Sequence, residues 1–307
     1  MLPEVQTWLR RRTTTAADWP VGKLAEAKGQ TSVSVVLPAR DERDTVGHIV
    51  GVIRRELRGL VDEIVVIDSR STDDTAAVAA RAGADVHAQD AILPDLPPLD
   101  GKGEALWKSL AVTSGDIVAF VDADIRGFRS TLVTGLLGPL LTDGSVAYAK
   151  GCYDRPLDGV PNGGGRVTEL VARPLINLHW PQLSGFVQPL AGEYAGRRSA
   201  LERVPFLTRY GVELGLLVDL LDLAGLDAFA QVDLGSREHA PQSTEALGCM
   251  SAQIMLAAYS RLLRQGKLGR CHELSPCLDQ FRRQGSGHLV VSTDVSVAER
   301  PPMLTLR

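Results

Sequence analysis

Two aspartates, Asp122 and Asp124, stand one residue apart directly after an apolar run, in the stretch "DIVAFVDADI". Alternate residues of an extended chain point the same way, so both carboxylates can address one ligand. A divalent cation beside a diphosphate needs one or two such hard oxygen ligands and leaves its other positions to phosphate and water. The same pattern is also typical of a strand that ends in a cap or turn, so only its neighbours can favour a metal site.

Polar residues also follow the two earlier apolar runs "VSVVL" and "EIVVI". "PARDE" comes after the first run and "DSRSTDD" after the second. Ser71, with Asp74 three residues later, has the spacing of a helix cap, which accounts for Ser71, Asp73 and Asp74 without any ligand. Asp68 and Ser69 then remain as candidate ligands.

The polar residues that follow the apolar runs can form one site only if the fold brings the ends of the strands together. The pattern predicts strands at 33–37, 63–67 and 117–121, and helices at about Asp44–Leu57, Thr72–Ala82 and Gly103–Val112. These strands are too apolar to have a face exposed to solvent, and they alternate with helices. The pattern predicts an α/β fold with a doubly wound, mostly parallel sheet that is covered on both faces. Ligands of such sheets bind beyond the carboxyl ends of the strands, so the polar residues should meet at one edge.

The second half of the chain is less regular. A glycine run in "PNGGGRVTELVARPL" is predicted to feed a helix, and further elements are a helix at 210–226, a strand at 228–234 and a helix at 243–265. The tail at 264–287 mixes charge, glycine and proline, so we expect a loop or partial disorder there. The predicted organisation is one continuous domain: an N-terminal segment at 1–30, a first half at 31–150 and a second half at 151–307.

The glycine run itself predicts an anion site. Successive backbone amides at a helix start, aided by the helix dipole, bind anions, and Arg166 directly after the run adds a fork of donors for phosphate or carboxylate. A flexible turn that caps a helix is the alternative interpretation.

Composition excludes several other classes. The chain has 307 residues, 44% of them hydrophobic, and 33 Lys and Arg against 37 Asp and Glu give a net charge of −4. We therefore expect a globular protein without general attraction to nucleic acid or anionic membrane. The four cysteines have no zinc spacing, so we expect free buried thiols in a reducing cytoplasm. No window approaches a membrane span, no secretory signal begins the chain, and the first 30 residues are predicted to be loosely held.

Together, "VVLPARDE", "VIDSRSTDDT", "GKGEAL" and "FVDADI" resemble the family-2-like glycosyltransferases of the GT-A fold. "NGGGRVTELVARPL", "QPLAGEYAGRR", "RYGVELGLLVD" and "ERPPM" are similar, more closely, to the glucosyl-3-phosphoglycerate synthases of actinobacteria. The resemblance runs from about residue 16 to the C-terminus and implies retaining transfer of glucose from UDP-glucose to 3-phosphoglycerate. It also implies a homodimer, with a nucleotide-sugar-binding half at 31–150 and an acceptor-binding half with the C-terminal tail at 151–307.

The resemblance implies the role of each site residue. The nucleotide sugar is expected at Pro38, Ala39, Arg40, Glu42, Ser69, Lys102, Asp122, Ala123, Asp124, Tyr210, Glu213 and Arg237. The acceptor is expected at Gly164, Gly165, Arg166 and Thr168. Asp124 and His239 are the implied ligands of Mg²⁺ or Mn²⁺, and Glu213, Arg237 and Asp122 the implied catalytic residues.

Two departures from the family pattern matter. Pro241 stands where a polar residue is common, which leaves the exact acceptor contacts open, and Ala123 stands where serine is frequent. Mannosyl transfer from GDP-mannose and a non-catalytic nucleotide-sugar-binding protein remain alternatives. A nucleotidylyltransferase is disfavoured, because "PARDERD" lacks the glycine-rich loop that such enzymes place after the first strand.

Overall fold

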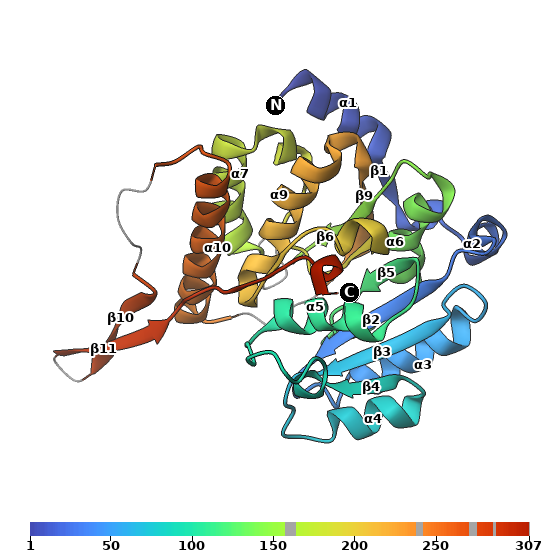
Figure 1. The fold of residues 1–307 in the computed structure, drawn as a ribbon, viewed down its shortest axis with the longest axis horizontal. Coiled ribbons are helices and arrows are strands. Elements are labelled where there is room, and N and C mark those ends of the chain that lie inside the picture. Colours follow the sequence, from blue (N-terminus) through green and yellow to red (C-terminus); the bar gives the residue numbers. More distant parts are fainter. Residues whose placement is uncertain (157–163, 238–241, 270–274, 285–286, 307) are drawn as a thin grey trace.

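The computed structural model describes residues 1–156, 164–237, 242–269, 275–284 and 287–306. Its centre is an eight-stranded sheet in the order β1-β9-β6-β7-β5-β2-β3-β4 (Figure 1). The strands are β1 Thr13–Thr15, β2 Val33–Ala39, β3 Glu63–Asp68, β4 Asp85–Ala88, β5 Ile117–Phe120, β6 Tyr148–Asp154, β7 Tyr194–Arg197 and β9 Phe229–Ser236. All neighbours pair in parallel except β7, which is antiparallel to both β5 and β6, so the predicted mostly parallel sheet is confirmed.

Helices cover both faces of this sheet, and each face has its own apolar core. One core is covered by α2 Val21–Lys28, α3 Val46–Glu56, α4 Thr75–Ala82 and α6 Thr131–Thr142. The other is covered by α1 Pro3–Arg12, α5 Lys102–Val112, α7 Arg173–His179, α9 Val212–Ala224 and α10 Thr244–Arg264. The central strands β2 and β5 are buried almost throughout, which explains their nearly continuous apolar sequences.

Shorter elements complete the fold. They are α8 Arg198–Leu201, the π-helical turn η3 Thr168–Ala172, the 3-10 turns η2 Gln89–Ala91 and η5 Arg209–Gly211, and the strand pair β8 Phe206–Leu207 with β12 Glu299–Arg300. The turn η3 leads directly into α7, so the helix predicted after the glycine run is confirmed.

The prediction of a loosely held N-terminal segment is wrong. Val5 and Trp8 on α1 are buried, and the Trp8 indole Nε1 donates a hydrogen bond of 3.0 Å to the carbonyl oxygen of Phe229. The threonines after α1 form β1, which pairs in parallel with β9 at the edge of the sheet. Only Val5 and Trp8 of α1 are fully buried, and three arginines end the helix, so its apolar pattern is too sparse to stand out in sequence.

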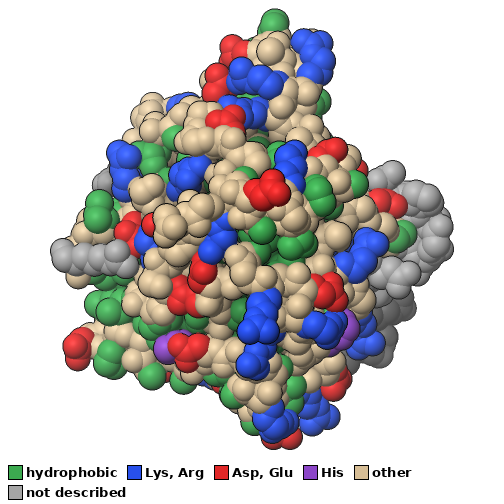
Figure 2. Space-filling view, turned by 90° about the vertical axis from the view of Figure 1, so that its right-hand side faces the viewer, with side chains coloured by type: hydrophobic (Ala, Val, Ile, Leu, Met, Phe, Trp, Pro, Cys, Tyr) green, Lys and Arg blue, Asp and Glu red, His purple; other side chains and the backbone are tan. Residues whose placement is uncertain are grey.

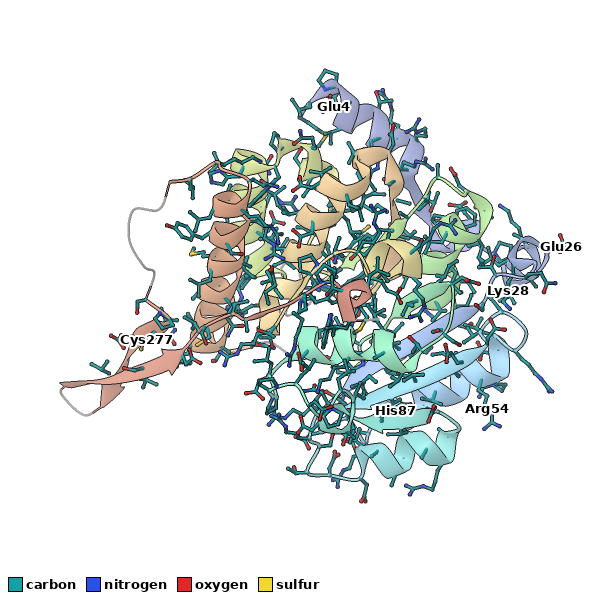
Figure 3. The ribbon with its side chains drawn as sticks, viewed as in Figure 1. Glu4, Glu26, Lys28, Arg54, His87 and Cys277 are labelled. Carbon is teal, nitrogen blue, oxygen red and sulfur yellow. The ribbon has the colours of Figure 1, made fainter. Side chains whose placement is uncertain are left out.

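The predicted loop at 264–287 is wrong in part. α10 ends at Arg264, but β10 Cys277–Gln284 and β11 Gly287–Asp294 form an antiparallel hairpin that projects from the body (Figure 1). Cys277, labelled on this hairpin in Figure 3, is exposed, so the expectation of buried thiols holds for Cys152 but not for Cys277. Cys271 lies outside the described residues. On the face drawn in Figure 2, acidic and basic side chains are interspersed.

One helix also corrects the expectation that no segment approaches a membrane span. Among the described residues, α10 is long and apolar enough by length and composition alone to cross a membrane. Core helices pass the same test, and α10 lies against α9 with Arg261 and Leu262 buried. The Arg261 Nη2 atom bonds the Asp219 Oδ2 atom of α9 at 2.5 Å, which fixes α10 to the body.

Candidate active site

The carboxyl ends of β2, β3 and β5 lie side by side, as parallel pairing requires. Pro38 pairs with Ile67 and Val36 with Phe120, so the polar residues after these strands reach the same edge. A cavity of about 740 Å³ opens there. Every predicted site residue in the described part of the chain lines it: Pro38, Ala39, Arg40, Glu42, Ser69, Lys102, Asp122, Ala123, Asp124, Gly164, Gly165, Arg166, Thr168, Tyr210, Glu213 and Arg237. His239 and Pro241 lie outside the described residues.

The two aspartates after β5 meet one guanidinium group. The Arg237 Nη2 atom lies 2.5 Å from the Asp124 Oδ1 atom, and Arg237 Nη1 lies 3.5 Å from the Asp122 Oδ2 atom. The Asp122 side chain is 25% exposed and that of Asp124 is 53% exposed. Asp122 thus belongs to the wall of the cavity, whereas Asp124 is more exposed, and its second carboxylate oxygen is not the one that pairs with Arg237.

Lys102 connects Asp122 to Glu213. It is the first residue of α5, and its Nζ atom forms an ion pair with Asp122 and lies 3.4 Å from the Glu213 Oε1 atom at the start of α9. Burial opposes the charged form of Asp122, but Lys102 and Arg237 outweigh it and hold the pKa of Asp122 well below its usual range. The pKa of Lys102 is raised in turn: burial lowers it, but Asp122 and Glu213 outweigh that effect. A side chain at Gly192 would collide with this pair, so only glycine fits there.

Glu193 is a site residue that sequence reasoning missed. It is fully buried, forms an ion pair with Arg237 Nη1, and accepts a 2.8 Å hydrogen bond from the Tyr153 hydroxyl. Burial, with the nearby charge of Asp122, raises the pKa of Glu193. Glu193 stands in "QPLAGEYAGRR". A charged residue among small apolar residues was the feature of the sequence that could have indicated a buried functional group.

Gly164 and Gly165, the described glycines of the run, line the cavity. Gly165 has a φ of +74°, which only glycine adopts freely, and the Gly164 amide donates to the Arg155 carbonyl oxygen at 2.8 Å. Arg166 is exposed on the rim, where its Nη2 atom donates to the Gln242 carbonyl oxygen at 3.0 Å. Arg155 also lines the cavity, and its Nη2 atom donates to the Tyr153 hydroxyl at 2.8 Å. Sequence reasoning missed Arg155, which precedes the run by several residues.

The predicted cap at Ser71 is wrong. The helix α4 begins at Thr75 with Asp74 at its cap position, and no side-chain capping bond forms there. The Asp73 Oδ1 atom instead accepts from the Thr75 amide at 2.9 Å, and the Ser71 hydroxyl accepts from the Asp41 amide at 3.0 Å. Of the two residues left as ligand candidates, Ser69 lines the cavity, whereas Asp68 accepts from the Ser71 amide at 3.3 Å.

Comparison with known proteins decides the family. A model described as glycosyl transferase family 2 matches residues 34–186. Glucosyl-3-phosphoglycerate synthase from Mycolicibacterium smegmatis is 48% identical over 98% of each chain. The enzyme of that name from Mycobacterium tuberculosis H37Rv is 44% identical over 100% of this chain and 94% of its own. The chain belongs to the glucosyl-3-phosphoglycerate synthase family.

Solved structures agree with this family assignment. Glucosyl-3-phosphoglycerate synthase from M. tuberculosis in complex with Mn²⁺, UDP and phosphoglyceric acid is 43% identical, with a TM-score of 0.86 over 96% of this chain and 99% of that one. Mannosyl-3-phosphoglycerate synthase from Rubrobacter xylanophilus is 39% identical, with a TM-score of 0.92 over 99% and 98%. The expected GT-A glycosyltransferase fold is therefore confirmed.

The acidic edge of this synthase-family cavity fits a hard divalent cation. Burial raises the pKa of Glu42, and the nearby charges of Asp124 and Asp122 raise it further. The three carboxyl groups therefore gather negative charge at this edge of the cavity. Carboxylate oxygens are the ligands that Mg²⁺ and Mn²⁺ prefer. Among the described residues, no group of three or more His, Cys, Asp or Glu side chains could hold a metal ion, and His239 remains the predicted partner of Asp124.

Lys150 is a buried lysine close enough to Lys102 and Glu213 for their charges to act on it. It is fully buried on β6, its Nζ atom donates to the Ala191 carbonyl oxygen at 2.7 Å, and it lies 4.5 Å from the Tyr194 ring centroid. Burial lowers the pKa of Lys150 to about 7, and the charge of Lys102 acts in the same direction against the opposing effect of Glu213.

This shift predicts that stability rises with pH above 7. An unfolded lysine keeps its proton up to about pH 10.4, whereas folded Lys150 releases it at about 7, so the unfolded chain binds more protons in between. We expect this group to add about 3 kcal/mol to the free energy of unfolding between about pH 7 and 9.5. Urea denaturation across this range should show that Lys150→Met removes the rise.

Lys23→Met is the matched control, because Lys23 is exposed. It should leave the slope of stability against pH unchanged. If the slopes of the wild type and Lys150→Met agree, the folded chain keeps the Lys150 proton and the expected effect of burial is absent.

Proposed function

We propose that this protein transfers glucose from UDP-glucose to the hydroxyl group of 3-phosphoglycerate, with retention of configuration, to give glucosyl-3-phosphoglycerate. The observation that carries the proposal is that every described site residue implied by the family pattern lines one cavity. Identity of 44–48% over almost the whole chain to the mycobacterial synthases supports the same reaction. Solved relatives are in complex with Mn²⁺, UDP and phosphoglyceric acid, and with Mn²⁺, UDP-glucose and phosphoglyceric acid, which supports the same pair of substrates.

The donor lies, in this proposal, along the ends of β2, β3 and β5. Pro38, Ala39, Arg40, Glu42 and Ser69 line the uridine side, and Lys102, Asp122, Ala123 and Tyr210 continue toward the sugar. Asp124 and His239 hold Mg²⁺ or Mn²⁺, whose charge when bound neutralises the diphosphate and eases departure of UDP. The donor site therefore draws on both halves of the chain, 31–150 and 151–307.

The acceptor lies against the glycine run in the same cavity. The backbone amide of Gly165, with the side chains of Arg166 and Thr168, offers hydrogen-bond donors to its phosphate and carboxylate groups, while Gly164 lines the same wall. Arg155 adds a second guanidinium on this wall, held by Tyr153. The acceptor hydroxyl then faces the sugar from the side on which UDP leaves.

The reaction breaks the bond between the glucose C1 atom and the UDP oxygen and forms a bond from C1 to the acceptor oxygen. The acceptor proton moves to the departing phosphate oxygen on the same face of the sugar. Glu213, with Lys102 beside it, orients the sugar hydroxyl groups, while Asp122 holds Lys102 in place. Arg237 provides positive charge next to the metal ligand Asp124, where negative charge grows on UDP.

Mannosyl transfer from GDP-mannose is the second candidate, since the mannosyl-3-phosphoglycerate synthase from R. xylanophilus has a TM-score of 0.92 to this chain. The two candidates are distinguished by an assay of each nucleotide sugar with each phosphorylated three-carbon acid, in which mass spectrometry identifies the products. UDP-glucose with 3-phosphoglycerate should give the fastest turnover. Faster turnover of GDP-mannose would replace the donor assignment, and no turnover with any pair would favour a non-catalytic binding protein.

Arg166→Ala is expected to raise the KM for 3-phosphoglycerate about 10- to 100-fold while changing the KM for UDP-glucose little. The physical reason is that the lost guanidinium faces only the acceptor anion. Steady-state kinetics with each substrate varied in turn measures this. Arg203→Ala, which removes an exposed arginine outside the cavity, should change neither constant. Equal weakening of both substrates by Arg166→Ala would place Arg166 elsewhere.

We also propose a homodimer in the cytoplasm. Both substrates are phosphorylated metabolites of the cell interior, which supports this location, and the family resemblance supports the dimer. Size-exclusion chromatography with light scattering should give twice the chain mass of 33.0 kDa.

A further inference from the structure

Gln89 is a buried residue of the cavity to which the proposed function assigns no role. It follows β4 two residues after His87, which Figure 3 labels, and its exposed fraction is 2%. Its side chain makes two hydrogen bonds. The Ser69 hydroxyl lies 2.8 Å from the Gln89 Oε1 atom, and the Gln89 Nε2 atom lies 3.1 Å from the Leu99 carbonyl oxygen.

The chemistry of these partners fixes the direction of both bonds. A carbonyl oxygen can only accept, so the amide nitrogen of Gln89 must face Leu99 and its oxygen must face Ser69. The Ser69 hydroxyl has one proton and donates it to Gln89. The Ser69 amide is also engaged, since it donates to the Ala39 carbonyl oxygen at 2.8 Å. What Ser69 can still offer to a ligand is therefore a lone pair.

A buried ion-pair frame holds Gln89 in this position. Lys108 Nζ donates to the Gln89 carbonyl oxygen at 2.9 Å and lies 3.6 Å from the Glu104 Oε1 atom. Glu104 also accepts from Arg300 Nε and Nη2, at 2.8 and 2.7 Å. Arg300 belongs to the C-terminal "ERPPM" stretch, so that motif supports the wall of the donor site from behind.

We propose that Gln89 is a positioning residue that determines nucleobase specificity, because it fixes the Ser69 hydroxyl as a hydrogen-bond acceptor. This inference rests on the proposed function, which places the base beside Ser69. Uracil carries an N–H at ring position 3 and satisfies the acceptor, whereas cytosine carries a lone pair there and repels it. Guanine also carries a ring N–H. The hydrogen-bonded pair of Gln89 and Ser69 therefore disfavours cytosine but does not discriminate between uracil and guanine.

The test is the ratio of CDP to UDP dissociation constants, measured by calorimetry on the full chain with Mg²⁺. The wild type should bind UDP about 10- to 100-fold more tightly than CDP. The Ser69 oxygen accepts a hydrogen bond from the N3–H group of uracil, whereas with cytosine its lone pair faces the lone pair of the ring nitrogen. Gln89→Met frees the Ser69 hydroxyl to turn, so this ratio should fall at least about fivefold. Overall stability changes would not alter the ratio.

A double-mutant cycle tests whether Gln89 acts through Ser69. Ser69→Ala should lower the ratio by itself, and adding Gln89→Met to it should lower the ratio no further. Gln231→Met is the matched control: Gln231 is equally buried and makes two hydrogen bonds, but it lies outside the cavity, so its loss should leave the ratio intact.

The outcomes separate this inference from the proposed function. If the wild type binds UDP and CDP equally, or if Gln89→Met keeps the wild-type ratio, the inference is overturned while glucosyl transfer stands. If the wild type binds neither UDP nor UDP-glucose, the proposed function itself fails. N3-methyl-UDP provides a test on the wild type that needs no variant to fold: binding as tight as that of UDP would overturn the acceptor role of Ser69.

Discussion

Asp124→Ala is expected to reduce glucosyl transfer about 100-fold or more and to weaken Mg²⁺ or Mn²⁺ binding by at least about tenfold. Asp124 is the more exposed aspartate of the pair after β5, and its oxygens face the cavity. Its loss leaves Asp122 as the remaining aspartate, and Lys102 and Arg237 already engage both oxygens of that residue. Activity titrated against metal concentration measures the two effects together.

The control removes the same charge outside the cavity. Asp233 on β9 is exposed and accepts from the Gly235 amide at 2.9 Å, so Asp233→Ala should leave the metal titration unchanged. His239→Ala should resemble Asp124→Ala, because the family pattern makes it the second ligand. Full turnover of either variant at limiting metal would reject the metal assignment.

The sequence predicted the donor side well because strand ends are easy to locate. Apolar runs in a parallel sheet are buried on both faces, so Arg40, the pair Asp68–Ser69 and Asp122 stand out as the polar residues that follow them. Their meeting at one edge follows from parallel pairing alone. The family resemblance added the residues from the second half, such as Arg166 and Glu213, which local patterns could not bring to the same place.

The missed residues act through long-range contacts that no local pattern encodes. Gln89 and Ser69 are separated by 20 residues, and Glu193 reaches Arg237 across 44. In the sequence, Glu193 follows small apolar residues and looks like part of the end of an apolar strand. Its role appears only once β7 lies between β5 and β6.

The N-terminal helix and the C-terminal hairpin escaped prediction for a different reason. Val5 and Trp8 are buried, but the three arginines that end α1 dominate its composition. The strands β10 and β11 satisfy their backbone groups with each other in a projecting arm, so their sequence needs no buried face. Neither element contributes the residues that the proposed reaction uses.

Glu193→Ala is expected to cost about 3–5 kcal/mol of stability and about 100-fold in kcat. The stability loss follows because Arg237, whose side chain is 8% exposed, keeps its charge but loses its buried partner. The loss of kcat follows because Arg237 loses the buried carboxylate that holds its Nη1 atom and is left with the more exposed Asp122 and Asp124, so it is held less firmly beside the departing UDP. Urea denaturation measures the first effect, and turnover at saturating substrates measures the second.

Glu202→Ala separates the two effects. Glu202 is also buried and pairs with Arg198 at 3.1 Å, but it lies outside the cavity, so its removal should destabilise the protein while turnover of the folded enzyme persists. Glu193→Gln keeps an oxygen for the Arg237 guanidinium and for Tyr153, and its kcat should lie between those of the wild type and Glu193→Ala. If Glu193→Ala lowers stability as Glu202→Ala does and keeps full kcat, then Glu193 supports only the fold, and Arg237 needs no buried carboxylate to act on the leaving group.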